Sequence, residues 1–208
     1  MYIIFLFLSL ILFPGVNTAD AGFDLGISAG DEGVKSFYLA VGDYYRVPQR
    51  EVMMIRERHI DDEEIPVVLF LASRIRVAPA AIIDMRLAGK SWMDITLRFG
   101  LSPEIFYIPV DAAKIGPPYG KAYGYYKTKP KKEWKHMKFS DADIVDLVNL
   151  RFISEHYKCS PEEVIRMRGK GKKFTAINND IEKEKKGRKE KIKEEKKEKH
   201  KGKGRKGD

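Results

Sequence analysis

Two stretches of the chain, APAAIIDMRLAGKSWMDI (residues 78–95) and SPEEVIRMRGKGKKFTAI (residues 160–177), decide its fold, because they are two versions of one pattern. A shift of 82 positions aligns them without a gap and gives seven identities in eighteen pairs. The identities are Pro79/Pro161, Ile83/Ile165, Met85/Met167, Arg86/Arg168, Gly89/Gly171, Lys90/Lys172 and Ile95/Ile177, and Trp92/Phe174 is a conservative pair. They fall on helix caps and on one apolar face, which indicates a repeated helical unit.

Each stretch predicts a short helix between turn signals. Residues 160–163 form a capping box with proline at the first helical position, and Gly171 ends the helix. Ser91 is a cap for a further helix that Trp92 opens. Arg86 and Arg168 each follow a core methionine, so we expect each to cover the helix end or to pair with an acid of the preceding helix.

The segments before these stretches predict longer helices. Residues 65–76 are apolar nearly all round, which is typical of a buried central helix. Residues 140–143 (SDAD) cap a long amphipathic helix. A weaker third copy lies at an offset of 30 positions, where Val47, Val52, Met53, Ile55 and Arg56 fall on Val77, Ile82, Ile83, Met85 and Arg86.

We therefore predict an all-α fold, a small helical bundle built from repeated helix-turn-helix-like units, with a basic tail that is either disordered or a solvated helix. The expected organisation is a signal peptide at 1–21, a leader loop at 22–35, a first helical unit at 36–110, a linker at 111–138, a second unit at 139–181 and a Lys/Glu tail at 182–208.

The repeated pattern resembles one found in uncharacterised exported bacterial proteins. Those proteins carry short repeats of the form S-P-E-E-(V/I)-x-x-(L/M)-R-x-x-G-x-(S/G)-(W/F)-x-x-I, which residues 160–177 and 78–95 match. The resemblance covers about half of the chain after residue 21 and implies no assigned activity. Lys173 departs from the pattern, where a small capping residue is usual, so the last helix is expected to fray.

The N-terminus has the pattern of a secretory signal. The apolar run of residues 2–13 (YIIFLFLSLILF) would span about 18 Å as a helix, which is too short for a bilayer. Pro14-Gly15 breaks it, and Ala19-Asp20-Ala21 predicts cleavage between Ala21 and Gly22. The segment before the run carries no Lys or Arg, and the alternative is an uncleaved anchor or a buried helix. We expect an exported, periplasmic or secreted bacterial protein with no transmembrane span in its mature chain.

The net charge of +9 is concentrated at the C-terminus. Residues 182–208 hold 14 Lys/Arg and 7 Asp/Glu, a net of +7, so the other residues carry only +2. This tail has a single apolar residue, Ile192, and cannot form a core. Its chemistry suits salt-dependent attachment to an anionic surface or polyanion, and the alternative is a solubilising tail without a partner. A protein partner for the body also stays open.

The linker is rich in Gly, Pro and Tyr, and no core face can be drawn through it. Its tyrosines are candidates for contact with a sugar, a base or a partner, and the competing interpretation packs them back on the body. The four are Tyr119, Tyr123, Tyr125 and Tyr126.

Two other function classes are a DNA-binding protein and an enzyme. A helix-turn-helix DNA reader fits the helix order, with Arg98 or the set of Lys173, Asn178 and Asn179 as base-reading side chains. An enzyme finds little support, because the sequence has no nucleophile elbow, phosphate loop or HExxH motif. We expect no catalytic residue, metal or cofactor. The histidines that could contribute to a metal site are His59, which lies beside an acidic run, and His156, which lies near Cys159. The single cysteine excludes an internal disulfide.

Overall fold

The computed structural model describes residues 32–111 and 115–203, with side chains up to residue 196, and this part of the chain contains helices and no strand. The prediction of an all-α fold is confirmed. The α-helices are α1 (Glu32–Tyr45), α2 (Gln49–Glu57), α3 (Ile65–Ile75), α4 (Pro79–Leu87), α5 (Trp92–Arg98), α6 (Gly120–Thr128), α7 (Asp141–Tyr157), α8 (Pro161–Gly169) and α9 (Phe174–Lys203). In the described ranges, the connections between them include the short 3₁₀ helices η1 (Asp62–Glu64), η2 (Pro103–Phe106) and η4 (Lys131–His136).

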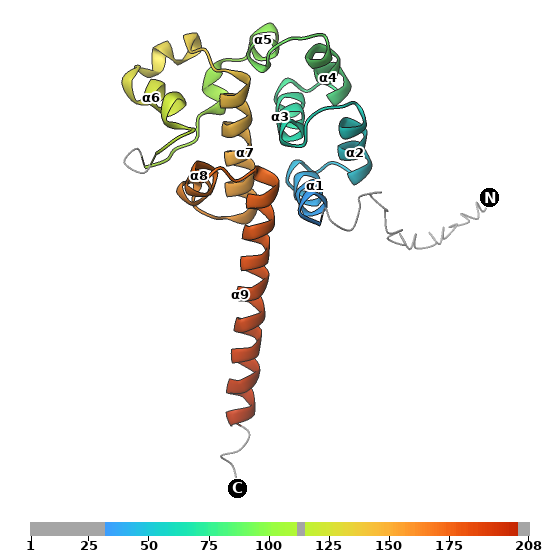
Figure 1. Ribbon diagram of the computed structural model, residues 1–208, viewed down its shortest axis with the longest axis vertical. Helices are drawn as coiled ribbons and strands as arrows, with labels where there is room; N and C mark the ends of the chain where they lie inside the picture. Colours follow the sequence, from blue (N-terminus) through green and yellow to red (C-terminus); the bar gives the residue numbers. More distant parts are fainter. Residues whose placement is uncertain (1–31, 112–114, 204–208) are drawn as a thin grey trace, which may run out of the picture.

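The helices pack around two central pairs. α3 lies against α7, and α1 lies against the first turns of α9 (Figure 1). α4 and α8 each follow their central helix through a tight turn and pack back on it, while α5 and α9 come next in the chain. One apolar core runs through all of these elements.

The central position of α3 follows from its sequence. All eight residues from Ile65 to Ala72 are buried, so the prediction of a buried central helix is confirmed. α7 begins where expected, because Ser140 and Asp143 form a reciprocal capping box at its first turn. Ser91 and Asp94 make the same box at the start of α5.

The predicted leader loop, residues 22–35, overlaps the first helix. α1 already begins at Glu32, within the Gly- and Asp-rich segment. Gly33 lies against the side chain of Asn179 in α9, so packing on a helix far along the chain stabilises this first turn. Residues 22–31 lie outside the described part.

The predicted linker at 111–138 contains ordered helices. α6 and η4 both lie in it, and Tyr119, Tyr123, Tyr126 and Trp134 are buried there. The absence of an apparent core face was misleading because these large side chains are distributed over α6, η4 and the residue that precedes α6. Tyr123, Tyr126 and Trp134 form an aromatic cluster with Tyr107 and Phe139.

The second unit and the tail share one helix. α9 crosses the predicted boundary between residues 181 and 182 and continues to Lys203, leaving the body as an extended helix (Figure 1). Of the two alternatives for the tail, the described part adopts the solvated helix. The fraying expected at Lys173 is not observed, because α9 begins directly at Phe174. Within the described residues, no helix combines the length and the hydropathy that a membrane span requires.

Candidate functional site

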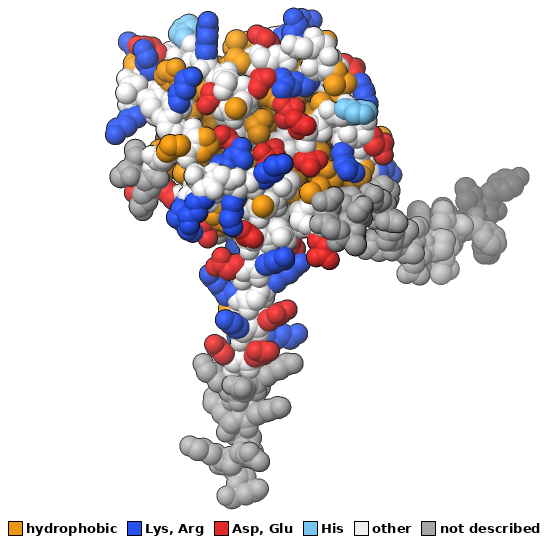
Figure 2. All heavy atoms as spheres, viewed as in Figure 1, with side chains coloured by type: hydrophobic (Ala, Val, Ile, Leu, Met, Phe, Trp, Pro, Cys, Tyr) orange, Lys and Arg blue, Asp and Glu red, His pale blue; other side chains and the backbone are white. Residues whose placement is uncertain are grey.

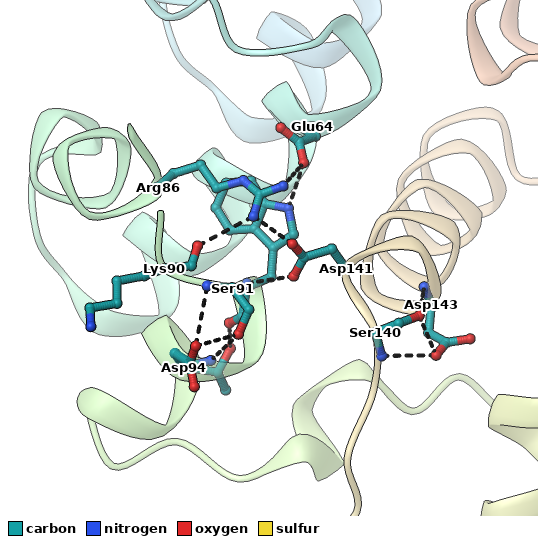
Figure 3. A network of polar contacts seen from close by, with 10 residues as sticks. Glu64, Arg86, Lys90, Ser91, Asp94, Ser140, Asp141 and Asp143 are labelled. Carbon is teal, nitrogen blue, oxygen red and sulfur yellow. Dashed lines mark hydrogen bonds and ion pairs between the residues drawn. The ribbon is translucent and has the colours of Figure 1, made fainter. Parts of the chain in front are cut away.

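Arg86 is the centre of a polar network between two halves of the body, of which the first comprises α1 to α5 and the second α6 to α9. Its guanidinium donates to Glu64 and to Asp141, with N–O distances of 2.5 Å each. The same group lies over the ring of Trp92, 4.7 Å from the ring centroid, and donates to the Lys90 carbonyl at 3.3 Å. Figure 3 shows Arg86 between the two carboxylates, one from η1 and one from the start of α7.

Trp92 shares both of these carboxylates. Its backbone N–H donates to Asp141 Oδ1 at 2.8 Å, and its indole Nε1 donates to Glu64 Oε1 at 3.0 Å. The first N–H groups of a helix have no partner within that helix, so Asp141 satisfies a donor that α5 leaves free. An acid at the start of α7 therefore fixes the start of α5.

Arg168 occupies the centre of a second network of the same form. Its Nε donates to Asp146 Oδ1 at 3.0 Å, and Nη1 lies 3.7 Å from Glu63 Oε2. The guanidinium lies 4.6 Å from the Phe174 ring centroid and donates to the Lys172 carbonyl at 3.1 Å. The N–H of Phe174 donates to Glu63 Oε1 at 2.5 Å.

The two networks are arranged crosswise. Each arginine pairs with an acid 22 positions before it, Glu64 for Arg86 and Asp146 for Arg168, and the 82-residue offset aligns these two acids. The acid that binds the N–H of the following helix comes from the other half, Asp141 for α5 and Glu63 for α9. Each half thus supplies a cap to the other.

The charges in these networks are neutralised within the fold. Burial opposes the charge of Arg86, but the hydrogen bonds that it donates to Glu64 and Asp141 outweigh burial and raise the pKa of the guanidinium. Burial raises the pKa of Asp146, and the nearby Arg168 only partly offsets this shift. Each arginine pairs with one acid from each half of the body, so the networks connect the two halves.

A polar hollow of about 740 Å³ lies beside the networks, between η1 and the starts of α7 and α9. Its charged lining consists of Arg56, Asp61, Asp62, Glu63, Glu64, Asp141, Arg168 and Lys173, which gives an excess of two negative charges. Four of these groups are committed to the two networks described above. No group of His, Cys, Asp and Glu in the described residues is arranged to hold a metal ion.

The other residues of the repeated pattern support the core. Met85 and Met167 pack against it from a partly buried position, and Pro79 and Pro161 are the first residues of α4 and α8. The fully or almost fully buried members are Ile83, Trp92, Ile95, Ile165, Phe174 and Ile177. The predicted cleavage residues Ala21 and Gly22 lie outside the described part of the chain.

The tyrosines proposed for contact are mostly internal. The hydroxyls of Tyr119, Tyr123 and Tyr126 donate to the carbonyls of Asp146, Ile108 and Pro103, at 3.3, 3.0 and 3.2 Å. Burial raises the pKa of all three, so they remain protonated donors. Tyr125 is only partly buried and packs near Phe139. The packing alternative therefore describes three of the tyrosines fully and Tyr125 in part.

Two of the base-reading side chains of the DNA alternative, Asn178 and Asn179, are used inside the fold. Asn178 is fully buried, donates to Ser36 Oγ at 3.0 Å and accepts from the Tyr157 hydroxyl at 3.0 Å. Asn179 packs against Gly33, and Lys173 is exposed. On α5, Arg98 is exposed beside Leu97. One surface of α9 that would face a groove is thus covered by α1.

His156 and Cys159 do not form a reactive pair. His156 lies among the rings of Tyr44, Phe152 and Tyr157. Burial raises the pKa of the Cys159 thiol to about 11, so the thiol stays protonated and is a poor nucleophile. His59 is exposed at the end of α2.

Sequence reasoning missed the acids of the networks as a set. The sequence presents Glu63 and Glu64 only as part of the acidic run beside His59, and it does not single out Asp146. The 82-residue offset contains the signal for one pair, since it aligns Glu64 with Asp146. No offset aligns Asp141 with Glu63 in the same way, so the crosswise caps required the tertiary structure.

The first prediction concerns the coupling of the two halves. In a double-mutant cycle, Arg86→Gln and Asp141→Asn should show a coupling free energy of about 1 kcal/mol in urea unfolding, because both groups are largely shielded from water. The control pair is Arg58 and Asp84, with side chains 46% and 65% exposed, whose cycle should give a value close to zero. Equal coupling in the two cycles would contradict the role given to Asp141.

The second prediction concerns pH. Burial is the main cause that lowers the pKa of His156 below its ordinary 6.5, so the unfolded chain binds a proton more readily than the folded one. Stability contributed by the neutral ring is therefore present above pH 6.5 and is lost as the pH falls through the folded pKa. Thermal unfolding should show a smaller loss of Tm between neutral pH and pH 5 in His156→Phe than in the parent chain. An identical loss in both would show that His156 does not contribute.

Comparison of the chain with protein-family models, with curated proteins and with solved structures gave no match.

Proposed function

We propose that this protein is an exported, non-catalytic helical binding or structural module, whose basic tail attaches it to anionic surfaces. The observation that carries the proposal is the path of α9. This helix starts in the core and continues into residues 188–196, which are all exposed (Figure 2). A body of packed helices is thereby joined without a break to a solvated basic segment.

The connection between body and tail is firm. Phe174, Ile177 and Ile181 are buried on one side of the first two turns of α9. Further along, Glu182 accepts from Ser36 Oγ, and Lys185 donates to the Tyr157 carbonyl. The direction in which the helix leaves the body is therefore set by contacts with α1 and α7, and the tail is not attached through a flexible joint.

We also propose that the body consists of repeated units, and the backbone supports this. Arg46, Arg76 and Lys158, which the offsets of 30 and 82 align, all have positive φ, at 57°, 63° and 52°. The next aligned set, His59, Gly89 and Gly171, has φ of 62°, 80° and 82°. Left-handed conformations are uncommon for residues other than glycine, so their recurrence in register favours repetition of one structural plan.

Export rests on the sequence of residues 1–21, which lies outside the described part. Fusion of residues 1–30 to a reporter that is active only outside the cytoplasm should give activity. A matched fusion with two arginines in place of Leu8 and Leu10 should abolish it, because the apolar run is interrupted. A silent parent fusion would remove export from the proposal.

Attachment through the tail is tested by truncation. A chain that ends at Gly187 keeps the contacts of Glu182 and Lys185 but lacks the charges that follow residue 187. It should lose most of its salt-sensitive retention on anionic vesicles while its thermal stability is unchanged. Retention equal to that of the full chain would show that the tail is not the attachment point.

A further inference from the structure

The exposed part of α9 separates its charges onto two sides. Successive residues of an α-helix are rotated by about 100°, which fixes the side of each residue from its number. Between residues 188 and 196, a sector of about 140° holds four basic residues and one apolar residue, and no acid. We call it the basic face, and its members are Arg188, Lys189, Ile192, Lys193 and Lys196.

The opposite sector holds the acids. It contains Glu190, Glu194 and Glu195 together with Lys191, which gives this side a net charge of −2 against +4 on the basic face. All nine side chains are exposed. A tail with the same composition in random order would mix the two signs on every side.

Most cations of the basic face are available to a partner. Arg188 pairs with Glu184, one turn earlier, at 3.1 Å and remains 71% exposed. Among the side chains that the structure describes, Lys189, Lys193 and Lys196 make no ion pair with an acid. These three lysines therefore place ammonium groups without an acidic partner along one side of the described part of the helix.

We propose that the basic face binds the phosphate headgroups of an anionic lipid bilayer, with α9 lying along the bilayer surface. This inference rests on the proposed function and names the side of the tail that carries it. A flat anionic surface contacts only one side of a helix, so the acids stay turned toward water. Clusters of four to eight Lys/Arg on a helix suit such surfaces, with roughly 1 kcal/mol for each cation.

The composition of the face specifies the mode of binding. Ile192 is its sole apolar residue, so the helix rests on the headgroups and does not insert as an amphipathic anchor would. Residues 183–196 contain no aromatic residue on which bases could stack and no Asn or Gln that could pair with adenine, so only Arg188 and the lysines could contact a base. These features favour a lipid surface over a nucleic acid.

The test uses full-length chains whose tails differ only in the order of their charges. In the face variant, Lys189→Glu, Glu190→Lys, Lys193→Glu and Glu194→Lys bring two acids onto the basic face, without any change in composition or net charge. In the control variant, Glu190→Lys and Lys191→Glu exchange charges within the opposite side and leave the basic face intact. Circular dichroism establishes that both keep the helix content of the parent.

Binding is measured by co-sedimentation with vesicles of phosphatidylcholine containing about one third phosphatidylglycerol at low salt. Binding to pure phosphatidylcholine is subtracted, because it reports apolar contributions such as that of residues 2–13. The control variant should partition like the parent, whereas the face variant should bind at least about tenfold more weakly.

The outcomes separate the two proposals. Equal binding by the face variant and the parent would overturn the basic face but keep attachment through the tail. Absence of binding by the parent itself would overturn the proposed function. Tighter binding of the parent to duplex DNA than to the vesicles, at the same salt and the same concentration of phosphate, would replace the bilayer with a nucleic acid.

Discussion

The crosswise exchange of carboxylates between the two halves of the body is the constraint on which the rest of the structure depends. Asp141 binds the first N–H of α5 and also Arg86, and Glu63 binds the first N–H of α9 and lies by Arg168. A helix start and a shielded guanidinium would lose a partner together if either acid moved away. The polar groups of both networks therefore find their partners only when the two halves take one relative position. An apolar contact alone would not specify that position.

Packing supplies the driving force, and the ion pairs select the arrangement. Trp92 and Phe174 are fully buried, and burial of such side chains contributes on the order of 2–3 kcal/mol each. Taking charges out of water costs free energy, as the raised pKa of Asp146 beside Arg168 illustrates. The arginine in each network reduces this cost, because it lies over the aromatic ring and forms ion pairs with acids on both sides. Polar pairing and apolar burial thus occur at the same residues.

The sequence predicted the elements whose signals are local and failed where distant segments decide. Caps at Ser91 and Ser140 and the apolar run before residue 76 identified α5, α7 and α3, since each signal lies within its own helix. α6 was missed because Gly120 and Gly124 indicate a turn, while the contacts that order this helix come from carbonyls at Pro103 and Ile108. For the networks around the arginines, the sequence indicates one acid of each, because the 82-residue offset aligns Glu64 with Asp146. It does not indicate the crosswise caps, because they depend on how the halves dock.

The net charge of the chain divides into two parts with different physical roles. In the body, arginines and acids pair across helices and hold its halves together, so they contribute little to the outside field. In α9 the charges are exposed, and the helical period separates them by side. The two sides of α9 have a defined direction relative to the body because the start of the helix is fixed. There, Glu63 binds the N–H of Phe174, and Asn178 forms hydrogen bonds with residues of α1 and α7. A helix fixed at one end keeps its sides in a constant relation to the body, so the networks in the core also orient the tail.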